Sequence, residues 1–262
     1  MTLAEAQKNI ILREEAEFPR LFAHAHETDY GVLFHQQSNA DCNDANHAIL
    51  CPQKISNLGA VLDDIRDFYL TKGLVPLIYP PYVPGYIEEN HVVFAQHGWK
   101  FVLYDNEYEE SRMMVLTEPS VINVPRRLEI RRLHEWDNNI AAAFGKQPNE
   151  PYLQVNRDCL RHENFYCFVG YLNGVPVTHT SLYVSPLGCT HFLDFETAEQ
   201  QRGQGYGREI IHFVTEFCRV QGFPLCYQWP ANATSERITT EAGFRVVFTC
   251  PGNVRAEYKG EA

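Results

Sequence analysis

The sequence predicts an α/β fold with mixed sheets, present as two tandem copies of which the first is degenerate. In residues 126–262, strand and helix patterns alternate in the order β-α-α-β-β-β-α-β-α-β. In residues 1–125, Pro76-Leu77-Ile78-Tyr79 parallels Pro224-Leu225-Cys226-Tyr227, and Gly98-Trp99 parallels Gly243-Phe244. These two matches lie 148 and 145 residues apart, and a consistent spacing indicates an internal repeat. We therefore expect two domains, residues 1–125 and residues 126–262.

The elements of the second copy are defined by hydrophobic periodicity and by turn residues. Asn173-Gly174 between two apolar runs is the strongest short-range signal for a β-hairpin. Gly222 is expected to end the helix that opens at Arg208. The expected elements, in chain order, are strand 128–133, helices 135–144 and 151–161, strands 165–172, 175–184 and 191–197, a helix from 208 and strand 223–227.

The glycine-rich run Arg202-Gly203-Gln204-Gly205-Tyr206-Gly207 lies between a strand and a helix. Glycine lets a ligand approach the backbone closely, and the N-terminus of a helix carries partial positive charge. Such a turn is suited to bind a diphosphate. The P-loop motif is excluded because its lysine is missing, and the dinucleotide motif GxGxxG is excluded because the glycine spacing differs.

The pattern Arg-x-x-Gly-x-Gly resembles the pyrophosphate-binding loop of the GCN5-related N-acetyltransferase (GNAT) family. Further elements of the family pattern follow in register over 43 residues, at Asn232, Ser235, Thr239 and Gly243-Phe244. The resemblance implies the acyl-CoA N-acyltransferase fold, acetyl-CoA as acyl donor and no metal. The positions that it implies for coenzyme A binding are Phe195, Thr197, Arg202, Gly203, Gln204, Gly205, Tyr206, Gly207, Arg208 and Asn232.

The resemblance also implies direct attack of an amine on the thioester, between two splayed parallel strands. A backbone N–H near residues 195–197 would polarise the thioester carbonyl. The candidates for the base are Glu196, Asp194 and His191, with Glu196 preferred because it lies closest to the expected carbonyl. Strand alternation predicts that Asp194 and Glu196 share one face. For each of the three, the alternative is a structural polar residue at a strand edge.

Thr239 departs from the family pattern, which has a tyrosine at this position to protonate the departing thiolate. A threonine hydroxyl is a much weaker acid than a phenol. Tyr227, Tyr206 or a water molecule could take its place, so the general acid stays unassigned.

The first copy lacks the features that would hold coenzyme A. Its expected elements are strand 47–51, a helical stripe at 61–69, strand 75–79 and a helix near 92–95, and Phe94 occupies the tyrosine position. Residues 51–60, which correspond to the loop, contain only Gly59. We expect this domain not to bind coenzyme A, the alternative being an unrelated α+β domain. The boundary is expected within residues 118–127.

Charge and composition limit the partners. The net charge is −11, with 8 basic and 18 acidic residues in positions 1–125. This argues against nucleic acid and is compatible with a cationic acceptor such as a polyamine or a basic peptide, or simply with a solvated acidic face. No apolar run reaches the ~18 residues of a membrane span. We expect a cytoplasmic protein without membrane contact, a monomer or homodimer, whose eight cysteines are mostly reduced core residues.

Three functions remain. The preferred one is an N-acetyltransferase that moves an acetyl group from acetyl-CoA to a primary amine of a small molecule or peptide. A non-catalytic coenzyme A-sensing or protein-interaction module is the alternative, motivated by Thr239 and the degenerate first copy. An aminoacyl-tRNA-dependent peptidyl transferase, which also pairs two such domains, is disfavoured by the intact loop and the acidic charge.

Overall fold

A computed structural model describes residues 3–260 except 82, 84, 104–109, 119–123, 144–149 and 252–253. It divides the chain into two compact units. Unit 1 comprises residues 1–14 and 112–249, and unit 2 comprises residues 15–111 and 250–262. This division differs from the expected split after residue 125, because each unit is built from two separate segments. Part of the expected boundary, residues 119–123, lies outside the described residues.

Unit 1 contains a seven-stranded mixed sheet. Its one described parallel pair is β10–β11, and the described neighbours on either side are antiparallel. The strands, in spatial order, are β12 (Phe244–Pro251), β6 (Glu110–Leu116), β11 (Cys226–Gln228), β10 (Cys189–Thr197), β9 (Val175–Ser185), β8 (Phe165–Leu172) and β7 (Glu129–Leu133).

The helical segments of unit 1 follow the expected order. They are α4 (Glu150–Cys159), α5 (Tyr206–Gln221) and α6 (Ala233–Glu241), with the 3-10 turns η5 (Asn138–Ala143) and η6 (Glu199–Gln201). The first 14 residues, which include most of α1 (Leu3–Glu17), also belong to this unit. Of the segment expected as helix 135–144, residues 138–143 form the 3-10 turn η5, residues 135–137 are not helical, and residue 144 lies outside the described part.

Local signals set the turns of unit 1 as expected. Asn173 and Gly174 have φ of 50° and 82°, the left-handed values that a tight β-hairpin turn requires. Gly222 ends α5 in the left-handed conformation. One strand is shorter than expected, because Leu225 has φ of 30° and regular β11 begins only at Cys226.

The core of unit 1 lies between α5 and the sheet. Ile210, Ile211 and Val214 of α5 are at most 1% exposed and belong to the same cluster as Phe192 of β10 and Phe168 of β8. All eight cysteines of the chain are free, and all but Cys51 are buried, as expected for reduced core residues. Among the described helices, none is long and apolar enough to cross a bilayer.

Unit 2 contains a six-stranded sheet whose strand arrangement corresponds to six of the seven strands of the unit 1 sheet. The spatial order is β1 (His24–Thr28), β2 (Gly31–His35), β3 (Ala48–Leu50), β4 (Leu77–Tyr79), β13 (Val254–Tyr258) and β5 (Trp99–Leu103). Its helices are α2 (Leu58–Thr71) and α3 (Tyr86–Gln96), with 3-10 turns η1 (Phe18–Leu21), η2 (Gln37–Asn39), η3 (Asn43–Ala45) and η4 (Pro52–Lys54). The pair β3–β4 is parallel, like β10–β11, and β13 is antiparallel to both of its neighbours. The internal repeat predicted from the sequence is thus present in the fold.

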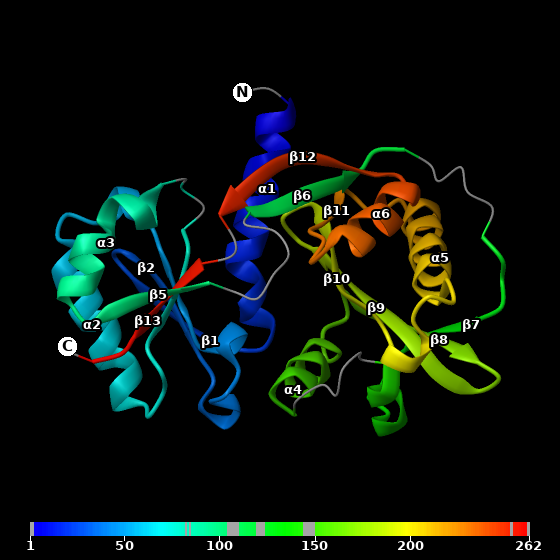
Figure 1. The fold of residues 1–262 in the computed structure, drawn as a ribbon, viewed down its shortest axis with the longest axis horizontal. Helices are drawn as coiled ribbons and strands as arrows, with labels where there is room; N and C mark the ends of the chain where they lie inside the picture. The colour runs from blue at the N-terminus through cyan, green and yellow to red at the C-terminus, as the bar shows by residue number, and fades with distance from the viewer. Residues whose placement is uncertain are drawn as a thin grey trace. The chain divides into compact units, whose positions relative to one another are not determined.

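Each sheet contains one interior strand from the other half of the sequence. In unit 1, β6 from the first half of the sequence lies between β11 and β12, whereas in unit 2, β13 from the C-terminal end lies between β4 and β5 (Figure 1). The two strands occupy equivalent places in the two sheets. Because both are interior strands, neither sheet is complete without a segment that is distant in sequence.

The position of β13 gives a stability prediction. Ala256 is 0% exposed and pairs with Ile78 and Phe101. Ala256→Glu places an unpaired charge inside the sheet and is expected to destabilise unit 2 by about 3 kcal/mol or more. Hydrogen exchange followed by mass spectrometry should then accelerate in residues 77–79 and 99–103, although the substitution is near the C-terminus.

The control for Ala256→Glu is Val175→Glu, at a strand position that is 57% exposed. It is expected to leave exchange in unit 2 unchanged. Faster exchange confined to unit 1 in the Ala256 variant would contradict the strand order.

Candidate active site

The central parallel strands of unit 1 separate after a short ladder. β10 pairs with β11 at Thr190–Cys226 and His191–Tyr227, while β10 continues to Thr197 and β11 ends at Gln228. Beyond His191, the second half of β10 therefore has no strand partner on its β11 side among the described residues. In the described part of the chain, that edge of β10 is therefore not covered by a neighbouring strand.

A β-bulge interrupts the second half of β10. The register with β9 passes from Leu193–Ser181 to Glu196–His179, so β10 has one extra residue, and Asp194 has φ of 49°. A non-glycine residue in this region is strained, and such strain is concentrated at functional sites. The regular alternation that predicted a common face for Asp194 and Glu196 does not apply across the bulge.

Tyr152 of α4 nevertheless brings both carboxylates into one cluster. Its hydroxyl is hydrogen-bonded to Asp194, and the charges of Asp194 and Glu196 both act on it. Burial, followed by these two charges, raises the pKa of Tyr152 well above its ordinary value, so the phenol stays protonated. Burial also raises the pKa of Glu196, against the attraction of Arg202. A raised pKa makes this carboxylate a stronger base than an exposed glutamate.

His191 and Tyr227 form a buried aromatic pair at the point where the two strands separate. Their rings are stacked, with centroids 4.6 Å apart and an angle of 18° between the planes. Burial lowers the pKa of His191 to about 3, so the imidazole is neutral and only weakly basic at physiological pH. This environment favours Glu196 over His191 as the base. Tyr227 is 0% exposed at the vertex of the split.

The glycine-rich loop opens the N-terminus of α5. Gly203 and Gly205 have φ of 77° and 86°, and Gly205 is the N-cap residue without a side-chain capping bond. The first N–H groups of an α-helix have no partner within the helix. The Arg202 side chain donates from Nε to the Thr197 carbonyl at 3.1 Å, which holds the loop against the end of β10.

Gly207 and Gly203 of the loop have different surroundings, which the sequence did not distinguish. A Cβ on Gly207 would lie 2.9 Å from the Phe195 ring and 3.1 Å from Thr197 Oγ1, so this glycine permits close packing of α5 on β10. A Cβ on Gly203, in contrast, would meet nothing within 4 Å. The space beside Gly203 is thus open, and the N-terminus of α5 next to it carries the partial positive charge of the helix dipole.

Two other positions of the family pattern are occupied by structural contacts. Asn232 caps α6, since its side chain accepts the N–H of Ser235 at 2.9 Å in a capping box. Thr239 is 2% exposed, and its hydroxyl lies 2.9 Å from both the Ser235 carbonyl and the Gln228 amide nitrogen. Thr239 is therefore a buried hydrogen-bonding residue within α6.

Unit 2 lacks an open helix N-terminus at the equivalent place. Asn57 caps α2 by accepting the N–H of Ala60 at 3.2 Å. A Cβ on Gly59 would lie 2.5 Å from the imidazole of His97, so this glycine accommodates a side chain. Both features distinguish this helix N-terminus from that of α5, and the expectation that the first copy does not bind coenzyme A stays a prediction.

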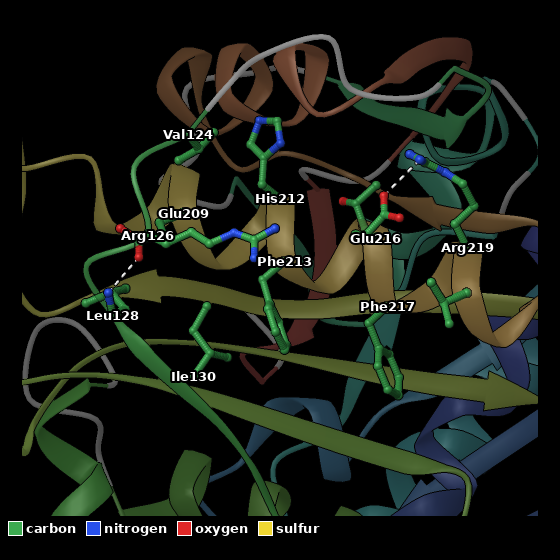
Figure 2. Close-up of a pocket in the computed structure, with 12 residues that line it drawn as sticks. Val124, Arg126, Leu128, Ile130, Glu209, His212, Phe213, Glu216, Phe217 and Arg219 are labelled. Carbon is green, nitrogen blue, oxygen red and sulfur yellow. Dashed lines mark hydrogen bonds and ion pairs between the residues drawn. The ribbon is translucent and has the colours of Figure 1, made fainter.

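Outside this site, unit 1 has a groove of about 610 Å³ between α5 and β7. Figure 2 shows Phe213 and Phe217 of α5 and Ile130 of β7 along it, with Glu216 and Arg219 paired on α5. None of the residues of the bulge or of the loop 202–207 lines this groove. It is therefore separate from the cluster described above. Among the described residues, no group of three or more His, Cys, Asp or Glu side chains could hold a metal ion.

Two residues of the site were not predicted. Tyr152 lies in the expected helix 151–161, but its pairing with Asp194 depends on the unpredicted bulge. Arg127 lies two residues before β7 and donates to the Gln204 carbonyl of the loop at 2.9 Å. No motif marks either residue, because both contacts join segments that are distant in sequence.

Comparison with known proteins finds a family match in the second half of the chain. Residues 130–244 match the model of the acetyltransferase (GNAT) family. No curated protein matches the sequence.

Solved structures extend the likeness of fold to both units. A GCN5-related N-acetyltransferase from Kribbella flavida has a TM-score of 0.63 at 15% identity, over 99% of this chain and 97% of that one. A GCN5-related N-acetyltransferase-like protein from Streptococcus suis has a TM-score of 0.55 at 13% identity, over 98% and 100%. A tandem GNAT protein from the clavulanic acid biosynthesis pathway has a TM-score of 0.56 at 12% identity, over 82% and 76%. The fold is therefore the acyl-CoA N-acyltransferase fold, in tandem.

The environment of Thr239 predicts a stability effect rather than a role as acid. Thr239→Val removes a hydroxyl bonded to the buried amide of Gln228. A buried donor left without its partner costs about 1–3 kcal/mol, so the urea midpoint should fall. The control Thr240→Val changes the next, exposed residue of α6 and should be nearly neutral. Equal stability of the two variants would refute this role.

Proposed function

We propose that unit 1 is an acetyl-CoA-dependent N-acetyltransferase that acts on a primary amine. The observation that carries the proposal is the uncapped N-terminus of α5 at Gly205, placed directly after the open end of β10. The loop would hold the diphosphate, and the edge of β10 from Phe195 to Thr197 would lie along the pantetheine arm. Acetyl-CoA, when bound, supplies an activated acyl group on a thiolate leaving group.

The residues of the loop would act through their backbone. N–H groups of Gly203, Gln204, Gly205, Tyr206 and Gly207 would face the diphosphate, with the dipole of the 16-residue helix α5 behind them. Arg202 would keep the loop joined to β10. Arg208 is ion-paired with Glu241 of α6, at 2.6 Å, so its contribution is to hold α5 and α6 together.

Glu196 would accept the proton of the attacking amine. An ammonium must lose a proton before it can attack, and a base with a raised pKa performs this better near neutral pH. Asp194, which is hydrogen-bonded to the Tyr152 hydroxyl, would attract the incoming cation. Tyr227, at the vertex of the split, remains the candidate to protonate the thiolate.

The acceptor would be a cationic small molecule or peptide carrying a primary amine. Two carboxylates, Asp194 and Glu196, lie at the open edge of β10 near α4, and they complement a positive charge. A polyamine, an aminoglycoside or a basic peptide has this chemistry. A panel of such amines, followed by release of free thiol from acetyl-CoA, identifies the acceptor. Binding without thiol release for any amine would favour a coenzyme A-binding module.

The diphosphate assignment predicts an effect of charge at Gly203. Aspartate and asparagine both tolerate the left-handed backbone and have nearly the same shape. Gly203→Asp adds a negative charge in the open space beside the loop and is expected to weaken acetyl-CoA binding roughly tenfold more than Gly203→Asn does. Isothermal calorimetry at low salt measures both affinities. Equal affinities in two folded variants would overturn the assignment.

The assignment of Glu196 predicts a change in the pH profile. The thiol-release rate of the wild type should fall as pH decreases through the raised pKa of Glu196, since protonation removes the base. Glu196→Gln should no longer show this fall in rate at low pH, which is the acid limb of the pH profile. Its rate should be lower than that of the wild type by about 100-fold or more. Because folding disfavours the ionised form of this buried carboxyl, the neutral variant should be as stable as the wild type or more so at pH 7.

The control for Glu196→Gln is Glu199→Gln, at an exposed position three residues later in η6. It should keep both the rate and the acid limb. If Glu196→Gln kept the acid limb of the pH profile unchanged, the base would be a residue other than Glu196.

A further inference from the structure

Arg127 makes three contacts with the glycine-rich loop and the first turn of α5. Its Nη2 donates to the Gln204 carbonyl at 2.9 Å. Its guanidinium lies over the Tyr206 ring, 4.8 Å from the centroid. Its Nε lies 3.4 Å from the carboxylate of Glu209, a side chain only 4% exposed. A single side chain from outside the loop therefore contacts the loop, the first helical residue and the first turn.

Glu209 fixes the backbone from which this side chain extends. Its Oε1 accepts the N–H of Arg127 at 2.5 Å and the N–H of Leu128 at 2.6 Å. Figure 2 shows this carboxylate of α5 directed at Leu128, where the chain enters β7. Two bonds from consecutive N–H groups to one buried carboxylate leave the Arg127 backbone little freedom. The guanidinium is thus positioned before any ligand arrives.

The contact with Gln204 has a geometric consequence for the loop. The C=O of Gln204 and the N–H of Gly205 belong to one trans peptide, in which the two groups point in opposite directions. When Arg127 binds this carbonyl, the Gly205 N–H is directed away from Arg127. Gly205 itself could otherwise rotate, since glycine has few steric limits on φ and ψ.

We propose that Arg127 is a positioning residue for diphosphate binding, because it fixes the orientation of the Gln204–Gly205 peptide. This inference rests on the proposed function of the loop. Arg127 acts through the peptide and not as a ligand of the phosphates. A purely structural role, as one more surface ion pair, would contribute little and would not distinguish between ligands with and without a diphosphate.

The chain provides a matched control at Arg131 of β7. This guanidinium also pairs with a glutamate, Glu129, at 2.7 Å, and lies over a tyrosine ring, that of Tyr171, at 4.7 Å. These contacts with Glu129 and Tyr171 lie outside the loop 202–207. Arg127→Ala and Arg131→Ala therefore remove the same kinds of interaction. They differ in the contact with Gln204 and in the burial of the paired glutamate, which is 4% exposed for Glu209 and 62% exposed for Glu129.

The test compares acetyl-CoA with S-acetylpantetheine, which keeps the thioester and pantetheine but lacks the diphosphate. We expect Arg127→Ala to weaken acetyl-CoA binding roughly tenfold, the usual effect of losing a hydrogen bond to a charged group. Its affinity for S-acetylpantetheine, measured by competition, should match that of the wild type. Arg131→Ala should change neither affinity. Equal acetyl-CoA affinity in the two variants, or equal losses for both ligands in Arg127→Ala, would overturn the proposal.

A second measurement uses the protein without ligand and does not depend on the proposed function. Amide hydrogen exchange of residues 203–207 should accelerate in Arg127→Ala and not in Arg131→Ala, because the loop loses its fixed peptide. Unchanged exchange would overturn the positioning role. A wild type that fails to bind acetyl-CoA would refute the proposed function, while faster exchange would still establish that Arg127 orders the loop.

Discussion

The short ladder between β10 and β11 is the constraint on which the candidate site depends. The two strands pair at Thr190–Cys226 and His191–Tyr227 only, and the stacked side chains of His191 and Tyr227 mark the last paired position. A longer ladder would engage the edge of β10 and leave no backbone groups for a ligand. Because β11 ends early, the second half of β10 pairs with β9 only among the described strands, and the bulge at Asp194 can form without disturbing a second neighbouring strand.

The exchanged strands make unit 1 dependent on a segment from the first half of the sequence. β6 pairs with β11 at Val115–Tyr227 and Met114–Gln228. Met114 is 1% exposed, and its sulfur lies 3.1 Å from the Gln228 amide nitrogen, next to Thr239. Thr239 stands where the family pattern has a tyrosine, and its surroundings therefore include Met114 from the first half of the sequence. Expressing residues 126–262 alone would omit an interior strand of the sheet.

The sequence predicts those features whose cause is local. Asn173-Gly174 and Gly222 determine their own backbone conformations, and the loop 202–207 is visible because glycine is needed at fixed positions. The strand exchange is not visible, since β6 and β13 have the pattern of any half-buried strand and their partners lie far away in sequence. The sequence does not predict the bulge at Asp194 or the contacts of Tyr152 and Arg127 for the same reason. Regular alternation, the rule used for Asp194 and Glu196, is the rule that a bulge breaks.

The helix N-termini of the two repeats differ in how their first N–H groups are satisfied. Both α5 and α2 follow a strand of a parallel pair, so both begin with N–H groups that need partners. In α2 the chain supplies a partner itself, because the Asn57 side chain accepts the N–H of Ala60. In α5 the N-cap is Gly205, and the acidic residue of the first turn, Glu209, binds the N–H groups of Arg127 and Leu128 instead. The negative charge that could have neutralised the start of α5 is thus engaged by another segment, which leaves the helix dipole available to an anion from outside.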